Sequence, residues 1–517
     1  MRHLSARRTW IAFELKRLKD FMKIFTRNKR GMLGIVILVV FIVLALAAPL
    51  ITPYDPITIP THPTRPPIAD RYAKPFWYEY LPTGEEMSGN FEPIEDPDFN
   101  SETSLEDLDF AASITDQSGV SDPQFVSDFG YNEEGCAKIV FTREATENRF
   151  GLVTANLTKT FDYADPSSPR RFIGMVAVWV DTTEEVPVTV RVVLENDGGE
   201  RRLEWWHQTF DTSGTRWVLP APIIDSYASK PWLKKTFGDE WQFPAETMFN
   251  ESATYRYSVE MMFDDTGGPE GENVEATVYI DDFDIRLFGT SFGVLGTDQY
   301  GRDILTQLLW GARISLMVGL LSALFSTGVG LIVGLVAGYM GRIVDQILMR
   351  FTDMLLVIPD TPLYIVLMAV LSPSVWNLVL LITAIGWTGF ARIVRSQVLS
   401  LRERPFVEAA KAVGASKFRI ILRHITPNVM SLVYVTLATS VPYAIVSEAW
   451  LSWLGLYDPT IMTWGRMLHD AQNTPLGIKM WWWIVPPGIC IALISLSFIL
   501  LGYALDEILN PKLRKRY

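Results

Sequence analysis

Residues 408–427 read Glu408-Ala-Ala-Lys-Ala-Val-Gly-Ala-Ser-Lys-Phe-Arg-Ile-Ile-Leu-Arg-His-Ile-Thr-Pro427, a polar and basic loop between two apolar runs. Just upstream, Pro405 can open one short helix, which Gly414 can end in a left-handed conformation. Ser416 can cap a second helix. Apolar side chains recur at helical spacing, as Val407, Ala410 and Val413 and then as Phe418, Ile421, Leu422 and Ile425. The pattern predicts a helix-turn-helix on a membrane surface, a shape that suits docking of a soluble partner. An ordinary amphipathic surface helix is the alternative, but it does not explain the glycine, the proline and the flanking spans together.

Charge is divided unevenly along the 517 residues, of which 49% are hydrophobic and 20% charged. Residues 57–290 hold 43 Asp and Glu against 18 Lys and Arg, a net charge of −25, whereas the remainder has a net charge of +13. This division predicts two bodies in two environments. The acidic body excludes nucleic-acid binding there, because phosphate contacts need positive charge. Cys136 and Cys490 lie in different regions, so no disulfide between them is expected.

Six apolar runs are long enough to cross a bilayer. The first is Gly31–Ile51, whose length and 30-residue basic leader favour a membrane helix over a cleaved signal peptide. The later runs are at about 313–340, 351–371, 375–396, 427–450 and 481–504. Lys and Arg gather in the leader, the 341–350 turn, the 391–426 loop and the tail, which places these segments and both termini in the cytoplasm. The acidic insert and the 455–479 loop then lie outside the cell.

Several separate motifs resemble the dipeptide/oligopeptide-type permease subunits of ABC importers. The basic loop resembles the EAA coupling loop of that family at Glu408, Ala409, Ala410, Gly414, Ile425 and Pro427, and departs from it at Thr426, where leucine is usual. Further matches are Leu295–Leu305, Trp310–Leu316, Arg350–Asp353, Gly389–Gln397, Ser447–Gly455, Thr463–Leu468 and Asn510–Arg514. The resemblance covers roughly residues 20–56 and 291–517 and runs in the family's order.

This resemblance implies a permease subunit in a prokaryotic plasma or inner membrane. It implies a second homologous permease subunit, two ABC ATPase subunits and an external substrate-binding protein as partners. ATP and Mg would bind the partner subunits, since this chain has no Gly-x-x-x-x-Gly-Lys-Ser/Thr phosphate loop. No nucleophile–base arrangement and no metal-ligand cluster is recognisable, so neither an enzyme nor a cofactor protein is expected.

Three sets of residues are candidates for function in the membrane core. Asp353, Asp360 and Glu448 fall within or beside apolar spans, where ionisable groups are costly and are candidates for translocation or gating. Snorkelling, or pairing of Asp353 with Arg350, is the simpler explanation.

One face of the second span carries only small residues, which lets another helix approach closely: Ser326, Gly330, Gly334 and Gly338. Packing inside this subunit is the default explanation. The permease signature comprises Gly296, Thr297, Asp298, Gly301, Arg302 and Asp303. In it Thr297 or Asp298 can cap a short helix, the glycines permit tight turns, and Arg302 can pair with Asp303.

The acidic insert reads as a linker followed by a β-domain. Residues 57–110 are rich in Pro, Glu and Asp and are expected to be poorly structured. Beyond them, alternating apolar residues predict strands at about 186–194, 255–263 and 274–287, with further strands at 172–180, 202–210 and 215–219. A shift of the alternation predicts a bulge at Asp281-Asp282. The strand that ends at Leu287 resembles the last strand of jelly-roll, carbohydrate-binding-module-like domains. Six tryptophans are expected mostly in the core, although they could stack sugars: Trp179, Trp205, Trp206, Trp217, Trp232 and Trp241.

The predicted fold is therefore an α-helical polytopic membrane protein with six transmembrane helices and an inserted extracellular β-sandwich. Its parts are a cytoplasmic segment 1–30, a first span 31–52, an acidic linker 53–110, a jelly-roll-like domain 111–290, and a permease core 291–517 with the coupling loop at 405–427. The predicted function is half of a translocation pore for di- and oligopeptides. Oligosaccharide import is the alternative within the family. A membrane-anchored receptor is the alternative of another class, although an anchor needs no coupling loop. A secondary transporter is disfavoured because no inverted repeat is visible.

Overall fold

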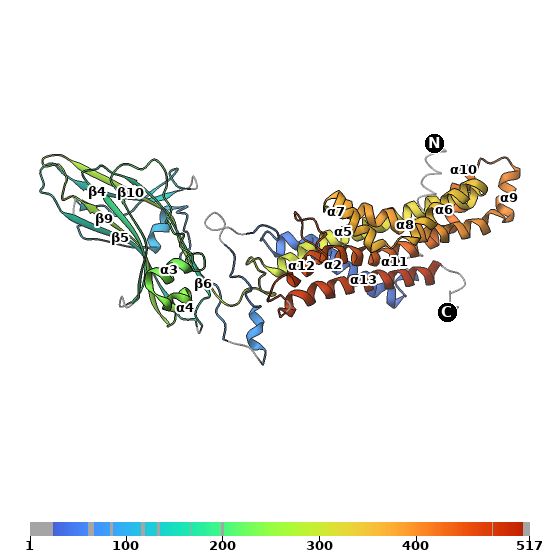
Figure 1. Cartoon of the computed structure of the whole chain (residues 1–517), viewed down its shortest axis with the longest axis horizontal. Coiled ribbons are helices and arrows are strands. Elements are labelled where there is room, and N and C mark those ends of the chain that lie inside the picture. The colour runs from blue at the N-terminus through green and yellow to red at the C-terminus, as the bar shows by residue number, and fades with distance from the viewer. Residues whose placement is uncertain are drawn as a thin grey trace, which may run out of the picture. The chain divides into compact units, whose positions relative to one another are not determined.

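The chain divides into two compact units, a helical unit of residues 1–58 and 304–517 and an insert unit of residues 59–303 (Figure 1). The computed structural model describes residues 24–59, 67–82, 86–114, 119–131, 135–165, 167–197, 201–477 and 479–509. Most of the predicted basic leader, the basic tail and the Asn510–Arg514 motif lie outside these residues. The insert unit begins before the predicted sandwich boundary at residue 111, so the predicted linker belongs to it from residue 59 onward.

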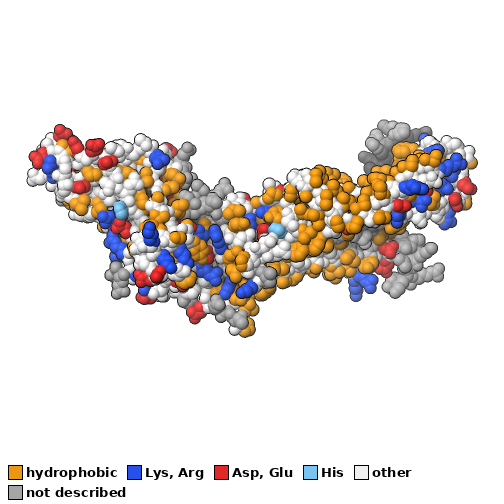
Figure 2. Space-filling view, viewed as in Figure 1, with side chains coloured by type: hydrophobic (Ala, Val, Ile, Leu, Met, Phe, Trp, Pro, Cys, Tyr) orange, Lys and Arg blue, Asp and Glu red, His pale blue; other side chains and the backbone are white. Residues whose placement is uncertain are grey.

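The helical unit is built around α5, which packs between α8 and α11, while α13 packs against α11 and α2. The helices are α2 (Lys29–Ile51), α5 (Ile304–Met340), α6 (Arg342–Val357), α7 (Asp360–Leu371), α8 (Val375–Arg402), α9 (Pro405–Ala412), α10 (Lys417–Ile420), α11 (Thr426–Trp453), α12 (Trp464–Gln472) and α13 (Trp481–Leu509). Figure 2 shows hydrophobic side chains over much of the visible face of this unit, with Lys and Arg gathered at the end that carries α9 and α10. A bilayer rather than a protein core can cover such a surface.

Five helices are long and apolar enough to cross a membrane, and the pair α6 and α7 makes a sixth if it counts as one span. The predicted continuous helix at 351–371 is wrong in this respect, because α6 and α7 meet at an angle of 89°. Ile358 between them is extended, and Pro359 follows it. Proline lacks the N–H that would continue the helix and pushes the preceding residue out of the helical region.

The insert unit is an antiparallel β-sandwich, as predicted. One sheet has the strand order β1-β5-β9-β7-β8, and the other has the order β2-β4-β10-β6 with β3 beside β4. The strands are β1 (Asp109–Ala112), β2 (Gly119–Val120), β3 (Gln124–Val126), β4 (Cys136–Arg143), β5 (Leu152–Tyr163), β6 (Arg171–Asp181), β7 (Val188–Asn196), β8 (Arg202–Phe210), β9 (Ala253–Asp264) and β10 (Val274–Phe288). Two short helices, α3 (Lys230–Phe237) and α4 (Pro244–Met248), lie between β8 and β9.

The alternating patterns located five strands correctly, namely β6, β7, β8, β9 and β10. The register of β10 against β6 shifts between Asp281 and Asp284, which confirms the predicted bulge. The predicted strand 215–219 is wrong, since only Val218 makes an isolated bridge, to Val178. No strand was predicted at β5, although Val153, Ala155 and Leu157 alternate along it and are buried.

The prediction of a poorly structured segment at 57–110 is wrong for its described residues from 67 onward. Ile94 and Phe99 are buried in the core of the sandwich. Phe91 bridges Leu287 at the end of β10, and Lys74 bridges Ser291. Acidic, proline-rich composition disfavours an independent core, but a few apolar side chains suffice to fix a segment against a core that already exists.

Candidate coupling and translocation site

The two predicted helices of the basic loop are present, and local signals start and stop them. Pro405 is the first residue of α9, where its missing N–H costs nothing. Gly414 follows α9 with φ +81, and no neighbouring atom would touch a β-carbon there. The conformation alone therefore requires glycine at this position. Ser416 is extended, and its side chain accepts a hydrogen bond from the backbone N–H of Arg419 at 3.4 Å.

The loop buries one side and exposes apolar residues on the other. Val407, Ile420, Ile421 and Ile425 are buried against residues of α5 and α8. Phe418 is 71% exposed and Val413 is 89% exposed. Of the apolar residues at helical spacing, Ile421 and Ile425 are buried, whereas Phe418 and Leu422 lie on the exposed side. Glu408 and Ala409 are also exposed, and Ala410 is half-buried. Exposed apolar side chains among Lys411, Lys417 and Arg419 make a surface suited to a protein partner.

The second short helix is continuous with the next span, contrary to the predicted boundary at Pro427. A single π-turn at Ile421–Ile425 joins α10 to α11. Pro427 removes one backbone donor at this point, and the Thr426 hydroxyl donates to the Ile421 carbonyl at 2.9 Å. A π-turn of this kind accommodates a proline without breaking the helix.

The small-residue face of α5 packs against α8 of the same chain. A β-carbon on Gly330 would lie 2.8 Å from the Trp387 carbonyl oxygen, and one on Gly334 would lie 2.6 Å from the Ala391 carbonyl oxygen. A β-carbon on Gly338 would lie 2.8 Å from the Val398 side chain, and Ser326 lies opposite Gly386. These approaches are too close for any side chain, so this face joins α5 to α8.

Among the charged candidates, Asp353 pairs with Arg392 and not with Arg350, and both partners are about half-exposed. About two turns earlier on α6, Asp345 binds Arg395 through two contacts, at 2.5 and 2.6 Å. Both pairs join α6 to α8. Neither arginine partner is predicted from the sequence, because residues 39 and 50 positions apart carry no local pattern.

Glu448 is fully buried within the helical unit. Its carboxylate accepts a hydrogen bond from Ser452 at 2.8 Å and contacts the Ser315 hydroxyl at 3.4 Å. The same Ser315 hydroxyl accepts from the backbone N–H of Trp464, the first residue of α12, at 3.3 Å. Glu448 therefore joins α5, α11 and α12 and has no surface for a substrate.

Asp360 is the candidate that lines a pocket. It is the first residue of α7, and its carboxylate accepts a hydrogen bond from the Tyr443 hydroxyl at 2.7 Å. Thr361, Tyr364, Ser447 and Trp450 line the same pocket.

The signature residues 296–303 form a tight turn in the insert unit, and no helix occurs between β10 and α5. The expected helix cap at Thr297 or Asp298 is wrong, because neither residue directly precedes a helix. Arg302 binds Asp298 at 2.7 Å, and the other oxygen of Asp298 accepts from the N–H of Tyr300 and of Arg302. Gly296 and Gly301 have φ +71 and +78, and each faces a backbone carbonyl where a β-carbon would clash. The Thr297 hydroxyl donates to the Asp70 carbonyl at 2.5 Å. The turn therefore holds the segment around residue 70.

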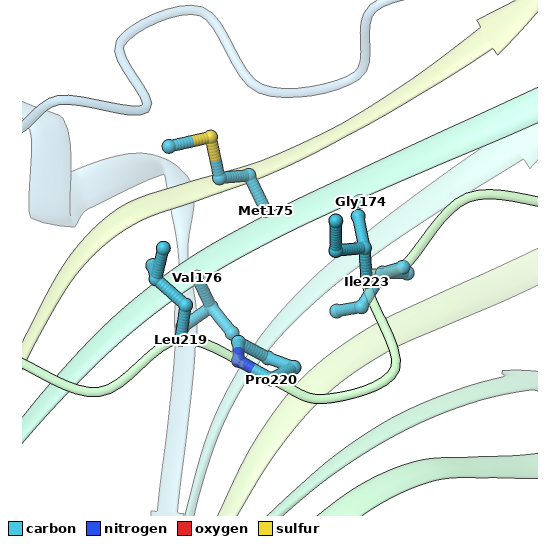
Figure 3. Close-up of a pocket in the computed structure, with 7 residues that line it drawn as sticks. Gly174, Met175, Val176, Leu219, Pro220 and Ile223 are labelled. Atoms are coloured by element: carbon cyan, nitrogen blue, oxygen red, sulfur yellow. The ribbon is translucent and has the colours of Figure 1, made fainter. Parts of the chain in front are cut away.

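A small pocket in the sandwich lies between β6 and the loop that follows β8 (Figure 3). Its lining residues are Gly174, Met175, Val176, Leu219, Pro220, Ile223 and Ile224, all without polar side chains. Sugars need hydrogen-bonding partners, and this lining supplies none from side chains. Four of the six tryptophans lie in or against the core, namely Trp205, Trp206, Trp232 and Trp241, which confirms that most are core residues.

Two family descriptions match this chain. Residues 330–515 match the binding-protein-dependent transport system inner membrane component, and residues 16–75 match the N-terminal TM domain of oligopeptide transport permease C. The dipeptide transport system permease protein DppC of Bacillus subtilis (strain 168) is 41% identical over 221 residues, which are 43% of this chain and 69% of that protein. The oligopeptide transport system permease protein OppC of the same organism is 39% identical over 222 residues, 43% of this chain and 72% of that protein. The chain belongs to this family of transport permeases.

The solved structures include partial resemblances to the insert of the permease. A structure of TmCBM61 in complex with β-1,4-galactotriose matches 38% of this chain and 97% of that chain, with 13% identity and a TM-score of 0.21. At that score no ligand is inferred for the insert. Among the described residues of the permease, no three His, Cys, Asp or Glu side chains are grouped so that they could hold a metal ion.

Proposed function

We propose that this permease subunit forms half of the pore of an ATP-driven ABC importer for di- and oligopeptides. The loop α9–Gly414–α10 carries the proposal. It presents exposed apolar and basic side chains around a turn that requires a left-handed backbone conformation at Gly414. The peptide substrate is supported by relatives that are named as dipeptide and oligopeptide permeases. The oligosaccharide alternative lacks support, since the insert pocket is apolar.

The proposed partners follow from this role. ATP hydrolysis takes place on two ATPase subunits that dock on the loop, a second homologous permease completes the pore, and a binding protein delivers substrate from outside. The basic residues of α9 and α10, together with Lys29 and Arg30 at the start of α2, favour a cytoplasmic position for this end of the bundle. Both termini are then cytoplasmic, and the insert is extracellular or periplasmic. A receptor whose helices only anchored it in the membrane would need no contact with an ATPase.

Uptake by a reconstituted complex tests the proposal. The complex of this chain, its partner permease and two ATPases is placed in proteoliposomes with the binding protein and radiolabelled tri-alanine or maltotriose. We expect accumulation of tri-alanine that requires both ATP and the binding protein. Accumulation of maltotriose alone would favour the sugar alternative, and a chain that copurifies with no ATPase would contradict the proposal.

We further propose that the insert helps to retain the binding protein at the pore. The insert continues at both ends into membrane helices, so the tether gives it a high effective concentration at the outer side without tight affinity. Its net charge of −25 offers an electrostatic surface to a basic patch on a partner.

Replacing residues 60–288 with a short Gly/Ser bridge is expected to weaken binding-protein association about tenfold. Partner permease and ATPases should still copurify, which is the control for folding. Unchanged association and uptake would contradict a docking role.

A further inference from the structure

The pocket between α7 and α11 contains a carboxylate that no cation of the described chain neutralises. One oxygen of Asp360 accepts from the Tyr443 hydroxyl at 2.7 Å, and the other accepts from the backbone N–H of Thr361 at 2.8 Å. Both donors are neutral. No Lys or Arg forms an ion pair with Asp360 within the part of the chain that the structure describes. Asp360 therefore differs from Asp345 and Asp353, each of which has an arginine partner.

This carboxylate lies well inside the apolar part of the bundle. The helix α7 has 12 residues and begins at Asp360, so its far end is about 18 Å away. On α11, Tyr443 is 10 residues before Trp453, or about 15 Å from that end. A carboxylate at such depth is expensive unless it faces a polar cavity or binds a cation.

A second polar group, the hydroxyl of Tyr364, lines the same pocket. Tyr364 is 3% exposed, and apart from an interaction with the Tyr443 hydroxyl its own hydroxyl has no hydrogen-bond partner among the described residues. Buried hydroxyls usually have a partner, because an unmade hydrogen bond costs about 1–3 kcal/mol. The indole of Trp450 is 46% exposed and lines the pocket as well. The pocket thus combines a carboxylate, an oxygen that can accept a hydrogen bond and an aromatic ring.

These three groups suit one kind of ligand, a primary ammonium. It would donate hydrogen bonds to Asp360 and Tyr364, and charge-assisted hydrogen bonds of this kind are the strong ones. It would also be attracted by the face of an indole such as that of Trp450. An anion would be repelled by Asp360, and a neutral apolar ligand would leave the carboxylate without a counter-charge.

We propose that the Asp360–Tyr364–Trp450 pocket binds the terminal ammonium of a peptide on its way through the pore. The inference rests on the proposed peptide import. Tyr443 acts as a positioning residue, since its hydroxyl holds the carboxylate on the pocket side of α7. The same ammonium chemistry could be supplied by a lysine of the partner permease, so the test separates the two sources.

Saturation-transfer NMR on the detergent-solubilised complex without binding protein gives a direct binding readout, with tri-alanine and N-acetyl-tri-alanine as probes. We expect transfer to the methyl groups of tri-alanine in the wild type. The signal should fall about tenfold with the acetylated probe and in Asp360→Asn. Asp353→Asn is the matched control, because that aspartate pairs with Arg392 outside the pocket. It should keep the wild-type signal. Equal signals for both probes, or no transfer in the wild type, would overturn the proposal.

Uptake in proteoliposomes provides the second readout. Asp360→Asn is expected to slow tri-alanine import about tenfold while ATP hydrolysis stimulated by the binding protein persists. If Asp360→Asn no longer assembles with the partner permease, the carboxylate serves subunit pairing and the proposal is overturned. A wild-type complex that imports no tri-alanine refutes peptide import itself. Wild-type import with an unaffected Asp360→Asn variant refutes only this pocket.

Discussion

Replacing Gly414 with valine is expected to abolish most ATP-driven uptake while leaving the bundle assembled. Gly414 has φ +81, a conformation that a β-branched residue strongly disfavours, at a cost of about 1–3 kcal/mol. A β-carbon there would touch nothing, so the strain acts on the turn between α9 and α10 and not on packing. The turn would open, and the surface formed by Phe418 and its basic neighbours, where we propose that the ATPase docks, would lose its shape. Uptake should fall about tenfold or more, with ATP hydrolysis no longer coupled to it.

Two variants separate conformation from size in this experiment. Gly414→Asn adds a side chain, yet asparagine tolerates the left-handed region, so near-normal uptake is expected. Gly328→Val is the control for size, because it places the same side chain in α5 at a position that also has open space around the β-carbon. The helical backbone there tolerates valine. Normal coupling in Gly414→Val, or equal loss in Gly414→Asn, would contradict a conformational role for Gly414.

Replacing Arg143 with methionine is expected to destabilise the insert unit by about 3–5 kcal/mol. Arg143 on β4 lies 2.9 Å from Asp265, and both side chains are completely buried. Arg143 also donates to the Pro269 carbonyl at 2.7 Å, and Asp265 accepts from the backbone N–H of Phe150 at 2.9 Å. Without the guanidinium, a carboxylate remains buried without its counter-charge, which is the costly outcome for such a pair.

Urea unfolding of the separately expressed insert, residues 59–303, measures this change, because the unit has its own core. We expect the wild-type segment to be soluble with a β-type circular dichroism spectrum.

Burial, together with the charge of Asp281, raises the pKa of the Cys136 thiol to about 12. This thiol should therefore resist labelling at pH 8 until the unit unfolds.

Lys234→Met serves as the control for the insert experiment. Lys234 pairs with Asp239 at 3.0 Å, but the two side chains are 46% and 91% exposed. Loss of an exposed pair should cost less than about 1 kcal/mol. If Arg143→Met also lowers the free energy of unfolding by less than about 1 kcal/mol, the charge pairing of Arg143 with Asp265 contributes little to stability. A helical or unfolded wild-type segment would contradict an autonomous sandwich.

Local sequence signals determined the elements whose formation needs only neighbouring residues. Pro405, Gly414 and Ser416 predicted the boundaries of α9 and α10, because each acts through its own φ or its own hydrogen bond. Apolar runs located α2, α5, α8, α11 and α13 for the same reason. Alternation located five strands, and its shift near Asp281 located the bulge in β10.

Tertiary structure alone decided which side chains meet. Asp360 and Tyr443 are 83 residues apart, and Arg392 lies 39 residues from Asp353. Arg302 binds Asp298, because the chain turns tightly between Gly296 and Gly301. Phe418 lies outside, although its periodicity resembles that of the buried Ile421 and Ile425. Periodicity reports that a helix has an apolar face, but the neighbouring helices decide which part of that face is covered, and their positions are not encoded in any short stretch of sequence.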